Sequence, residues 1–178
     1  MHTKDELAHY SALAQTLLKN RGITTEAEAV KFLNPSYDRD VHNPFLMLGM
    51  ERAVSRILTA VEAQENIVIF GDYDCDGIPG SVLLYDFFKK IGYDNVRVYI
   101  PHRHNEGYGM NVPAIEALAN EGAQLLITVD CGITEVEEVV RAHELGMEVI
   151  ITDHHIPSDV LPRAYAIVNP KQSDCAYP

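Results

Sequence analysis

The chain from residue 67 onward alternates short apolar runs with stretches whose apolar residues recur at helical spacing. The apolar runs are rich in β-branched residues and predict strands at 67–71, 96–100, 125–129, 149–152 and 166–168. The stretches between them predict helices at 81–91, 112–120 and 135–145. Apolar strands joined by helices are typical of a sheet whose two faces are both covered. We therefore expect an α/β fold, a parallel β-sheet with helices on both faces.

The residues before this region have a different pattern. Apolar residues recur at helical spacing over 7–21, and Thr25 is a suitable cap for a shorter helix that ends at Leu33. The stretch 34–44 is polar and contains prolines, which predicts an irregular connector. Helical spacing returns over 50–63. We expect a short helical N-terminal segment and connector at 1–48, followed by one α/β domain at 49–178.

The amino-acid composition excludes some classes of function for this chain. Hydrophobic residues make up 47% and charged residues 22%, which is typical of a globular protein with a core. Acidic residues outnumber basic ones by 26 to 14, which argues against a protein that holds nucleic acid by bulk positive charge alone. Carboxylates that bind divalent cations remain compatible with this balance. The three cysteines lack CxxC spacing, and no signal-like start or membrane-length apolar run is present, so we expect a cytoplasmic chain without membrane contact.

Side chains that can bind metal ions or phosphate directly follow four of the predicted strands. In a parallel sheet, ligands bind at the edge where the carboxyl ends of the strands lie. These side chains are Asp72, Asp74 and Asp76 after the first strand, His102, Arg103 and His104 after the second, Asp130 after the third, and Asp153, His154 and His155 after the fourth. We therefore expect them to form one site.

The first of these loops carries three aspartates at alternate positions, 72, 74 and 76. In an extended chain they would spread over about 13 Å, too far for one ion to bind all three. Either the loop curls at Gly77 or different aspartates bind different ions, and a pair of adjacent ions would suit a subset of them. An EF-hand is the nearest alternative, but its twelfth position is Leu83 and a strand precedes the loop. Simple capping of the next helix would need only one aspartate.

Asp130 alone is a weak signal, because an aspartate before a helix commonly caps it. The pair of His154 and His155 directly behind Asp153 is a stronger one. Neighbouring residues of a strand point to opposite faces, so we expect one imidazole to bind a metal ion and the other to face a substrate phosphate or orient a ligand. Oxygen ligands with one or two imidazoles suit Mn²⁺ and Mg²⁺ better than softer metals.

Three separated motifs, in this order and at these separations, resemble the DHH phosphoesterase superfamily. They are Asp72-Tyr-Asp-Cys-Asp-Gly77, Val129-Asp-Cys-Gly132 and Asp153-His-His155. Within that superfamily, the segments Ile100-Pro-His-Arg103 and Glu106-Gly-Tyr-Gly109 resemble those of the exonucleases specific for single-stranded DNA. The resemblance runs from about residue 11 to the end of the chain and implies a Rossmann-like domain.

The resemblance also implies roles for individual residues. Asp74 and Asp76 would bind metal, with Asp72 supporting or sharing, Asp130 would bridge two Mn²⁺ or Mg²⁺ ions, and His154 would bind one of them. The implied reaction is hydrolysis of phosphodiesters in single-stranded DNA from the 5′ end, in DNA repair and recombination.

Other residues and partners follow from the same resemblance. His155 would lie near the scissile phosphate, and Arg103 and, less certainly, His102 would contact substrate phosphate. Single-stranded DNA is the implied substrate, a single-strand-binding protein or a helicase is an implied partner, and we expect a monomer.

Two departures from the family pattern leave alternatives open. Pro79-Gly80 stands where a hydroxyl residue is expected, and Pro178 falls in mid-domain, before a further metal-binding aspartate and a second, substrate-binding domain of the family. We therefore expect an N-terminal portion, incomplete at its C-terminal end, that binds Mn²⁺ weakly and has little or no nuclease activity alone. The alternatives are a phosphatase or nano-RNase acting on small nucleotides, and a non-catalytic truncated module that binds metal or a partner.

Overall fold

The computed structural model describes residues 5–178, which form two compact units that separate between Asn43 and Pro44. The domain boundary expected after residue 48 remains a proposal. Each unit has its own buried core.

The helices of the first unit are α1 (Ala12–Lys19), α2 (Glu26–Leu33) and α3 (Tyr37–Asp40). α1 is shorter than the helix expected at 7–21 because it begins after Ser11, whose hydroxyl oxygen accepts a hydrogen bond from the Ala14 N–H. Leu7, Leu18 and Ala29 form the small core of this unit. α3 lies in the stretch expected to be irregular and buries no residue.

The second unit contains a five-stranded parallel sheet in the order β2-β1-β3-β4-β5. The strands are β1 (Ile67–Gly71), β2 (Val96–Tyr99), β3 (Leu125–Val129), β4 (Glu148–Thr152) and β5 (Ala166–Val168). All five were expected within a residue of these bounds. The α/β fold with a parallel sheet is confirmed.

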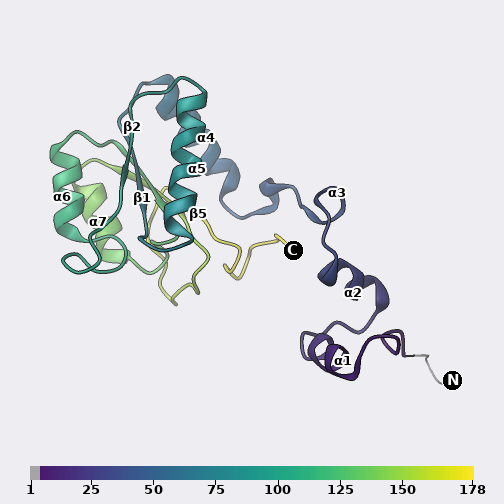
Figure 1. The fold of residues 1–178 in the computed structure, drawn as a ribbon. Helices are drawn as coiled ribbons and strands as arrows, with labels where there is room; N and C mark the ends of the chain where they lie inside the picture. Colours follow the sequence, from purple (N-terminus) through teal and green to yellow (C-terminus); the bar gives the residue numbers. More distant parts are fainter. Residues whose placement is uncertain (1–4) are drawn as a thin grey trace. The chain divides into compact units, whose positions relative to one another are not determined.

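The helices of the second unit cover both faces of the sheet (Figure 1). They are α4 (Met50–Glu62), α5 (Gly77–Lys90), α6 (Val112–Asn120) and α7 (Val136–Glu144), with a 3₁₀ turn, η1 (Pro44–Leu46), before α4. Residues of α4 and α5 pack on one face, and residues of α6 and α7 pack on the other. No helix within residues 5–178 has both the length and the apolar character needed to cross a membrane.

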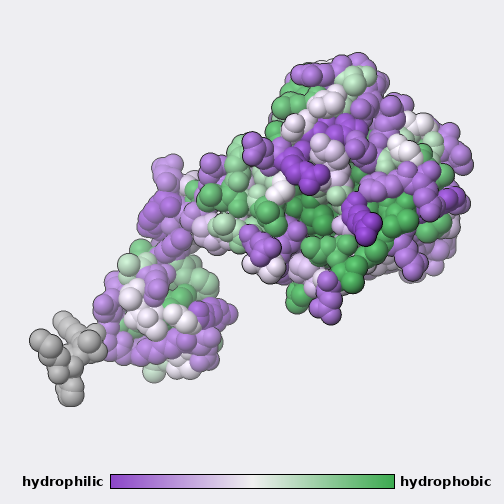
Figure 2. Space-filling view, turned by 180° about the vertical axis from the view of Figure 1, so that it is seen from behind, coloured by the Kyte–Doolittle hydropathy of each residue, from purple (hydrophilic) through white to green (hydrophobic). Residues whose placement is uncertain are grey.

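β1 shows why these strands are apolar on both faces. Val68 and Phe70 belong to the core under α6 and α7, whereas Ile67 and Ile69 belong to the core under α4 and α5. Every residue of this strand is buried. Apolar residues also reach the surface of the unit among polar ones, as Figure 2 shows for the side seen from behind.

α5 begins at Gly77, four residues before the start expected at residue 81. Pro79 lies in its first turn, where a backbone N–H has no partner inside the helix and its loss costs little. Gly77 is packed so closely that a Cβ atom there would lie 2.4 Å from the carbonyl oxygen of Asp72. The helix therefore starts directly against the first acidic loop.

Candidate metal centre

The register of the sheet aligns the residues that follow its strands. Gly71 pairs with Val129, and Val129 with Thr152, at the carboxyl ends of β1, β3 and β4. The ladder continues one residue further, through hydrogen bonds from the backbone N–H groups of Asp72, Asp130 and Asp153 to the carbonyl oxygens of Val129, Thr152 and Val168, at 3.1, 3.0 and 3.1 Å respectively. Three acidic residues thus begin three neighbouring loops at one edge.

The first acidic loop curls rather than extends. Oδ1 of Asp74 accepts hydrogen bonds from the backbone N–H groups of Asp76 (2.8 Å) and Gly77 (3.1 Å). These two donors hold the pKa of Asp74 below its usual value. The curl turns Asp72 and Asp74 toward Asp130, so that one ligand oxygen from each lies within 4.8 Å of the others.

Asp130 lies at the centre of the site. It is buried and has a left-handed backbone with φ of 64°, which is uncommon for a residue other than glycine. Burial, helped by the negative charge of Asp74, raises the pKa of its carboxyl group. Its Oδ1 atom is fully buried, and its ion-pair contacts within residues 5–178 are with the imidazoles of His154 and His155. A buried carboxylate is costly unless a nearby donor or cation compensates it.

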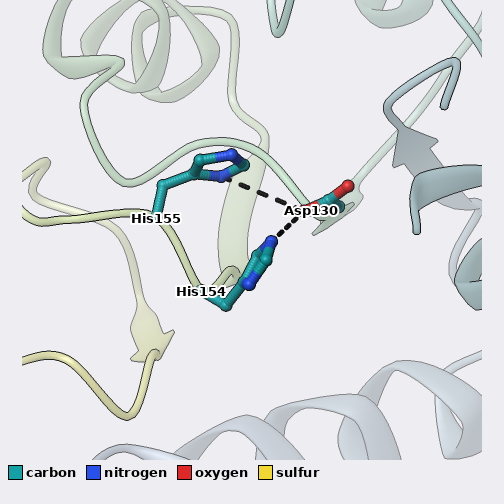
Figure 3. A group of neighbouring side chains, drawn as sticks. All are labelled: Asp130, His154 and His155. Atoms are coloured by element: carbon teal, nitrogen blue, oxygen red, sulfur yellow. Dashed lines mark ion pairs between the residues drawn. The ribbon is translucent and has the colours of Figure 1, made fainter. Parts of the chain in front are cut away.

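Both histidines approach Asp130 from one segment (Figure 3). Nε2 of His154 lies 2.9 Å from Asp130 Oδ1, and Nδ1 of His155 lies 3.9 Å from the same atom. The expected divergence of neighbouring side chains does not occur because β4 already ends at Thr152, so strand alternation no longer applies. One ligand atom from each of Asp130, His154 and His155 lies within 4.8 Å of the others.

Asp153 orients the two histidines. Its buried Oδ1 accepts hydrogen bonds from the backbone N–H groups of His154 (2.6 Å) and His155 (3.0 Å), and it lies 2.7 Å from Nδ1 of His155. Its Oδ2 accepts from the N–H of Ile133 at 3.0 Å. The Asp153 carboxylate therefore holds Nδ1 of His155 in place and fixes the orientation of its ring.

Tyr108 is a site residue that the sequence argument missed. Its hydroxyl donates a hydrogen bond to the carbonyl oxygen of Asp130 at 3.0 Å and lies 3.2 Å from Nδ1 of His155. Burial raises the pKa of this hydroxyl, so it stays protonated. The only local signal was its place between Gly107 and Gly109 in a motif shared with the exonuclease branch.

The loop after β2 reaches the site through one of its three basic residues. The guanidinium carbon of Arg103 lies 4.2 Å from the centre of the Tyr73 ring, and its charge contributes to the lowered pKa of Asp74. The rings of His102 and His104 are 5.9 Å apart. Within residues 5–178, no contact of these two rings joins them to the carboxylates described above.

The donor set fits a hard divalent cation. Two triplets, Asp72–Asp74–Asp130 and Asp130–His154–His155, each gather three ligand atoms, and Asp130 belongs to both. Oδ1 of Asp72 is buried without a hydrogen bond among the described residues. Such oxygen and imidazole donors suit Mn²⁺ or Mg²⁺. Asp76 belongs to neither triplet, and its Oδ2 lies 3.9 Å from Nε2 of His154.

Comparison with known proteins identifies the family. A profile described as the DHH family, N-terminal domain, matches residues 66–176, which include every residue of both triplets. The chain belongs to the DHH family. The resemblance found in the sequence is therefore confirmed.

Several relatives of this DHH chain share one name. It is 44% identical over 173 residues to the single-stranded-DNA-specific exonuclease RecJ of Bacillus subtilis, covering 97% of this chain and 22% of that protein. It is 34% identical over 179 residues to RecJ of Escherichia coli, covering 99% of this chain and 30% of that protein. The chain thus spans between a fifth and a third of the length of these relatives.

Two solved structures resemble this DHH chain in fold. Exonuclease RecJ bound to manganese matches with a TM-score of 0.69 and 34% identity, over 75% of this chain and 34% of that one. RecJ of Thermus thermophilus in complex with Mn²⁺ matches with a TM-score of 0.69 and 27% identity, over 97% of this chain and 24% of that one.

Proposed function

We propose that this chain carries the metal centre of a Mn²⁺-dependent exonuclease that hydrolyses single-stranded DNA from the 5′ end, in DNA repair and recombination. The names of its relatives and the manganese in two similar structures support this proposal. The single observation that carries it is Asp130, a buried carboxylate that belongs to two triplets of metal-type ligands.

The proposed division of labour follows from the contacts of each residue. Asp72 and Asp74 would hold one ion together with Asp130, and His154 would help Asp130 to hold a second, so Asp130 would belong to both ligand sets. Asp76 lies at the margin of the site and contributes from the side of His154. Bound divalent ions supply a lowered pKa of water and a counter-charge for a phosphodiester.

His155 acts on the substrate rather than on a metal ion. Its Nδ1 atom is engaged by the Asp153 carboxylate, which is itself held by the Ile133 N–H. This contact fixes the imidazole ring, so that Nε2 can face the scissile phosphate.

Arg103 supplies the substrate contact on the opposite side of the first loop. Stacking on Tyr73 orients its guanidinium, which is suited to bidentate contact with a phosphate. His102 remains a proposed phosphate contact with weaker support, because its contacts lie within its own loop.

Several finer points belong to the same proposal. Mg²⁺ is the alternative metal, since both ions prefer oxygen ligands. Single-stranded DNA is the substrate, with a single-strand-binding protein or a helicase as partner and a monomer as the acting form. A cytoplasmic location agrees with three free cysteines.

The test combines metal binding with cleavage. Calorimetric titration of the 178-residue chain with MnCl₂ measures the metal site, and gel analysis of 5′-phosphorylated single-stranded DNA measures hydrolysis. We expect weak Mn²⁺ binding and slow cleavage, both lost in Asp130→Asn. The matched control is Asp86→Asn on the exposed side of α5, which removes a carboxylate far from the triplets in sequence and leaves both signals unchanged.

Other outcomes separate the alternatives. Mn²⁺ binding without cleavage of any DNA would favour a non-catalytic module. Cleavage confined to dinucleotides or small nucleotides would favour the phosphatase or nano-RNase alternative. Absence of Mn²⁺ binding at millimolar concentration would contradict the metal centre itself.

A further inference from the structure

A cleft of about 410 Å³ adjoins the candidate metal centre, a volume typical of small-molecule sites. Its lining residues are of two kinds. The polar ones are Asp76, Asp130, Asp153 and His154, and Met47, Val168 and Pro170 together with Thr152 form its apolar wall. A nucleotide has the same two-part character, with a charged phosphate beside a flat base.

Met47 reaches this cleft because its turn lies directly on β5. A Cβ atom on Gly49 would lie 2.3 Å from the carbonyl oxygen of Ile167, so only glycine permits the two backbones to approach this closely. The neighbouring N–H of Leu48 lies 3.5 Å from Sγ of Cys175. These contacts fix Met47 beside the strand, where it packs against the core that includes Val168.

The opposite end of the apolar wall is fixed from the site itself. Asn169, between Val168 and Pro170, is fully buried. Its Nδ2 donates a hydrogen bond to the carbonyl oxygen of His155 at 2.9 Å, and its Oδ1 accepts from the N–H of Lys171 at 2.8 Å. The position of the wall is thereby coupled to the segment that carries the histidines.

The apolar wall offers no free hydrogen-bonding side chain. Met47, Val168 and Pro170 have no donor, and the hydroxyl of Thr152 already donates to the carbonyl oxygen of Thr128 at 2.5 Å. Such a surface can contact the face of a base but cannot read its edges. Methionine suits this role because its thioether is flexible and makes favourable contacts with aromatic rings.

We infer that Met47, Val168 and Pro170 form a subsite for the nucleobase next to the phosphate at the metal centre, and that this subsite accepts all four bases. The inference rests on the proposed function, since it needs a phosphate bound beside Asp130 and His154. The apolar wall and the ligand residues line the same cleft, so one bound nucleotide can contact both.

The test compares ligands that share a phosphate but differ in the base. The 178-residue chain is titrated in MnCl₂ with 2-deoxyribose 5-phosphate and with each of the four deoxynucleoside 5′-monophosphates. We expect the four nucleotides to bind with similar affinity and about tenfold more tightly than the sugar phosphate, as for stacking on a protein side chain.

Variants assign the difference to Met47. In Met47→Ala the preference for nucleotides falls several-fold while binding of the sugar phosphate is unchanged, and Met47→Leu retains most of the preference. Leu48→Ala is the matched control, because Leu48 is the next residue in the same turn and does not line the cleft. Circular dichroism checks that each variant is folded.

The outcomes distinguish the two proposals. Equal binding of nucleotide and sugar phosphate by the unmodified chain, or a strong preference for one base, would overturn the subsite alone. Loss of both ligands in a folded Met47→Ala would also overturn it. If neither ligand binds in the presence of Mn²⁺, the proposed function fails and the subsite fails with it.

Discussion

At the amino ends of β1 and β4, side chains of opposite charge pair with one another, whereas at the carboxyl ends like charges gather. Arg56 of α4 is 7% exposed and donates hydrogen bonds to Glu65, just before β1, and to Glu148, the first residue of β4. At the other edge, Asp72, Asp74 and Asp130 bring ligand oxygens within 4.8 Å of one another. The partners of the acids there are imidazoles, His154 at 2.9 Å from Asp130 and His155 at 2.7 Å from Asp153. A guanidinium compensates the acids at one end of the sheet, whereas at the other end the acids outnumber the imidazoles beside them.

The difference shows what each end contributes. A buried charge next to its counter-charge supports the fold, and losing either partner leaves the other charge uncompensated. Buried carboxylates without cations disfavour the fold, so their presence at a binding edge indicates a cation from outside the chain. The contrast therefore predicts opposite results for charge removal at the two ends.

Removal of Arg56 is expected to have the largest effect on stability. Arg56→Ala leaves Glu65 and Glu148 without their cation and should lower the free energy of unfolding by about 3 kcal/mol, with Mn²⁺ affinity unchanged. Urea unfolding followed by circular dichroism measures this loss. Arg97→Ala, which removes a more exposed ion pair with Glu121, is the control and should cost less than about 1 kcal/mol. Equal losses of unfolding free energy in the two variants would contradict the proposed difference between the two ends of the sheet.

Replacement of Asp153 tests the carboxyl end without touching the proposed ligands. Asp153→Asn keeps one oxygen for the histidines but turns an N–H₂ group toward the Ile133 N–H. We expect Mn²⁺ affinity to fall by about tenfold, as for other groups that orient metal ligands. Calorimetry measures the affinity, and the imidazole resonances in NMR spectra should shift for both histidines. Unchanged resonances would mean that Asp153 does not orient them.

Glu135 is a further acid near the carboxyl ends of the strands, just before α7, and burial raises its pKa to about 7. Since the pKa is raised above its unfolded value, its contribution to stability is complete below about pH 4.5 and is lost as the pH rises to about 7. Glu135→Gln should therefore gain stability relative to the unmodified chain between these limits, by about 2 kcal/mol.

Urea unfolding of both chains at several pH values checks this difference. The glutamine oxygen can still accept the hydrogen bond from the Met110 N–H, so the backbone contact is retained. The stability gained by Glu135→Gln should increase as the pH rises. A gain that stays constant from pH 5 to pH 8 would contradict the prediction, and a gain that decreases with rising pH would mean that a cation neutralises Glu135.

The smallest expected effect is a gain of stability in Asp130→Asn without metal. The change removes a buried negative charge next to Asp74, and we expect about 1 kcal/mol of additional stability. Thermal unfolding in a chelating buffer measures it. Excess Mn²⁺ should reverse the order, because only the unmodified chain gains binding energy from the metal.

The sequence predicted those features of the fold that depend on neighbouring residues of the chain. Each strand could be predicted because an apolar run ended at a polar residue, and the aligned ends then placed Asp72, Asp130 and His154 at one edge. Whether the first loop curls could not be predicted from the sequence. The curl depends on the early start of α5, and the proline in the first turn of that helix obscured this start. The sequence thus predicted which edge of the sheet carries the site, but not the local geometry of the site.

The missed contributions depend on tertiary contacts. Tyr108 reaches Asp130 across a loop, and Met47 lies far from the site along the chain. Asp153 was noted at its strand end, but its role as an orienting acceptor required hydrogen-bond geometry. Periodicity carries no information about which distant segment completes a cleft.

The close approach of Gly49 to Ile167 has a consequence for the outer border of the sheet. β5 is the last strand in the order, and a strand in that position presents a row of unpaired amide and carbonyl groups that can recruit another chain. The turn that carries Met47 occupies part of this row. A bulkier residue at position 49 would force the turn away from Ile167 and uncover this part of the border. A hydrogen atom in place of a side chain thereby lets the chain cover part of its own sheet edge.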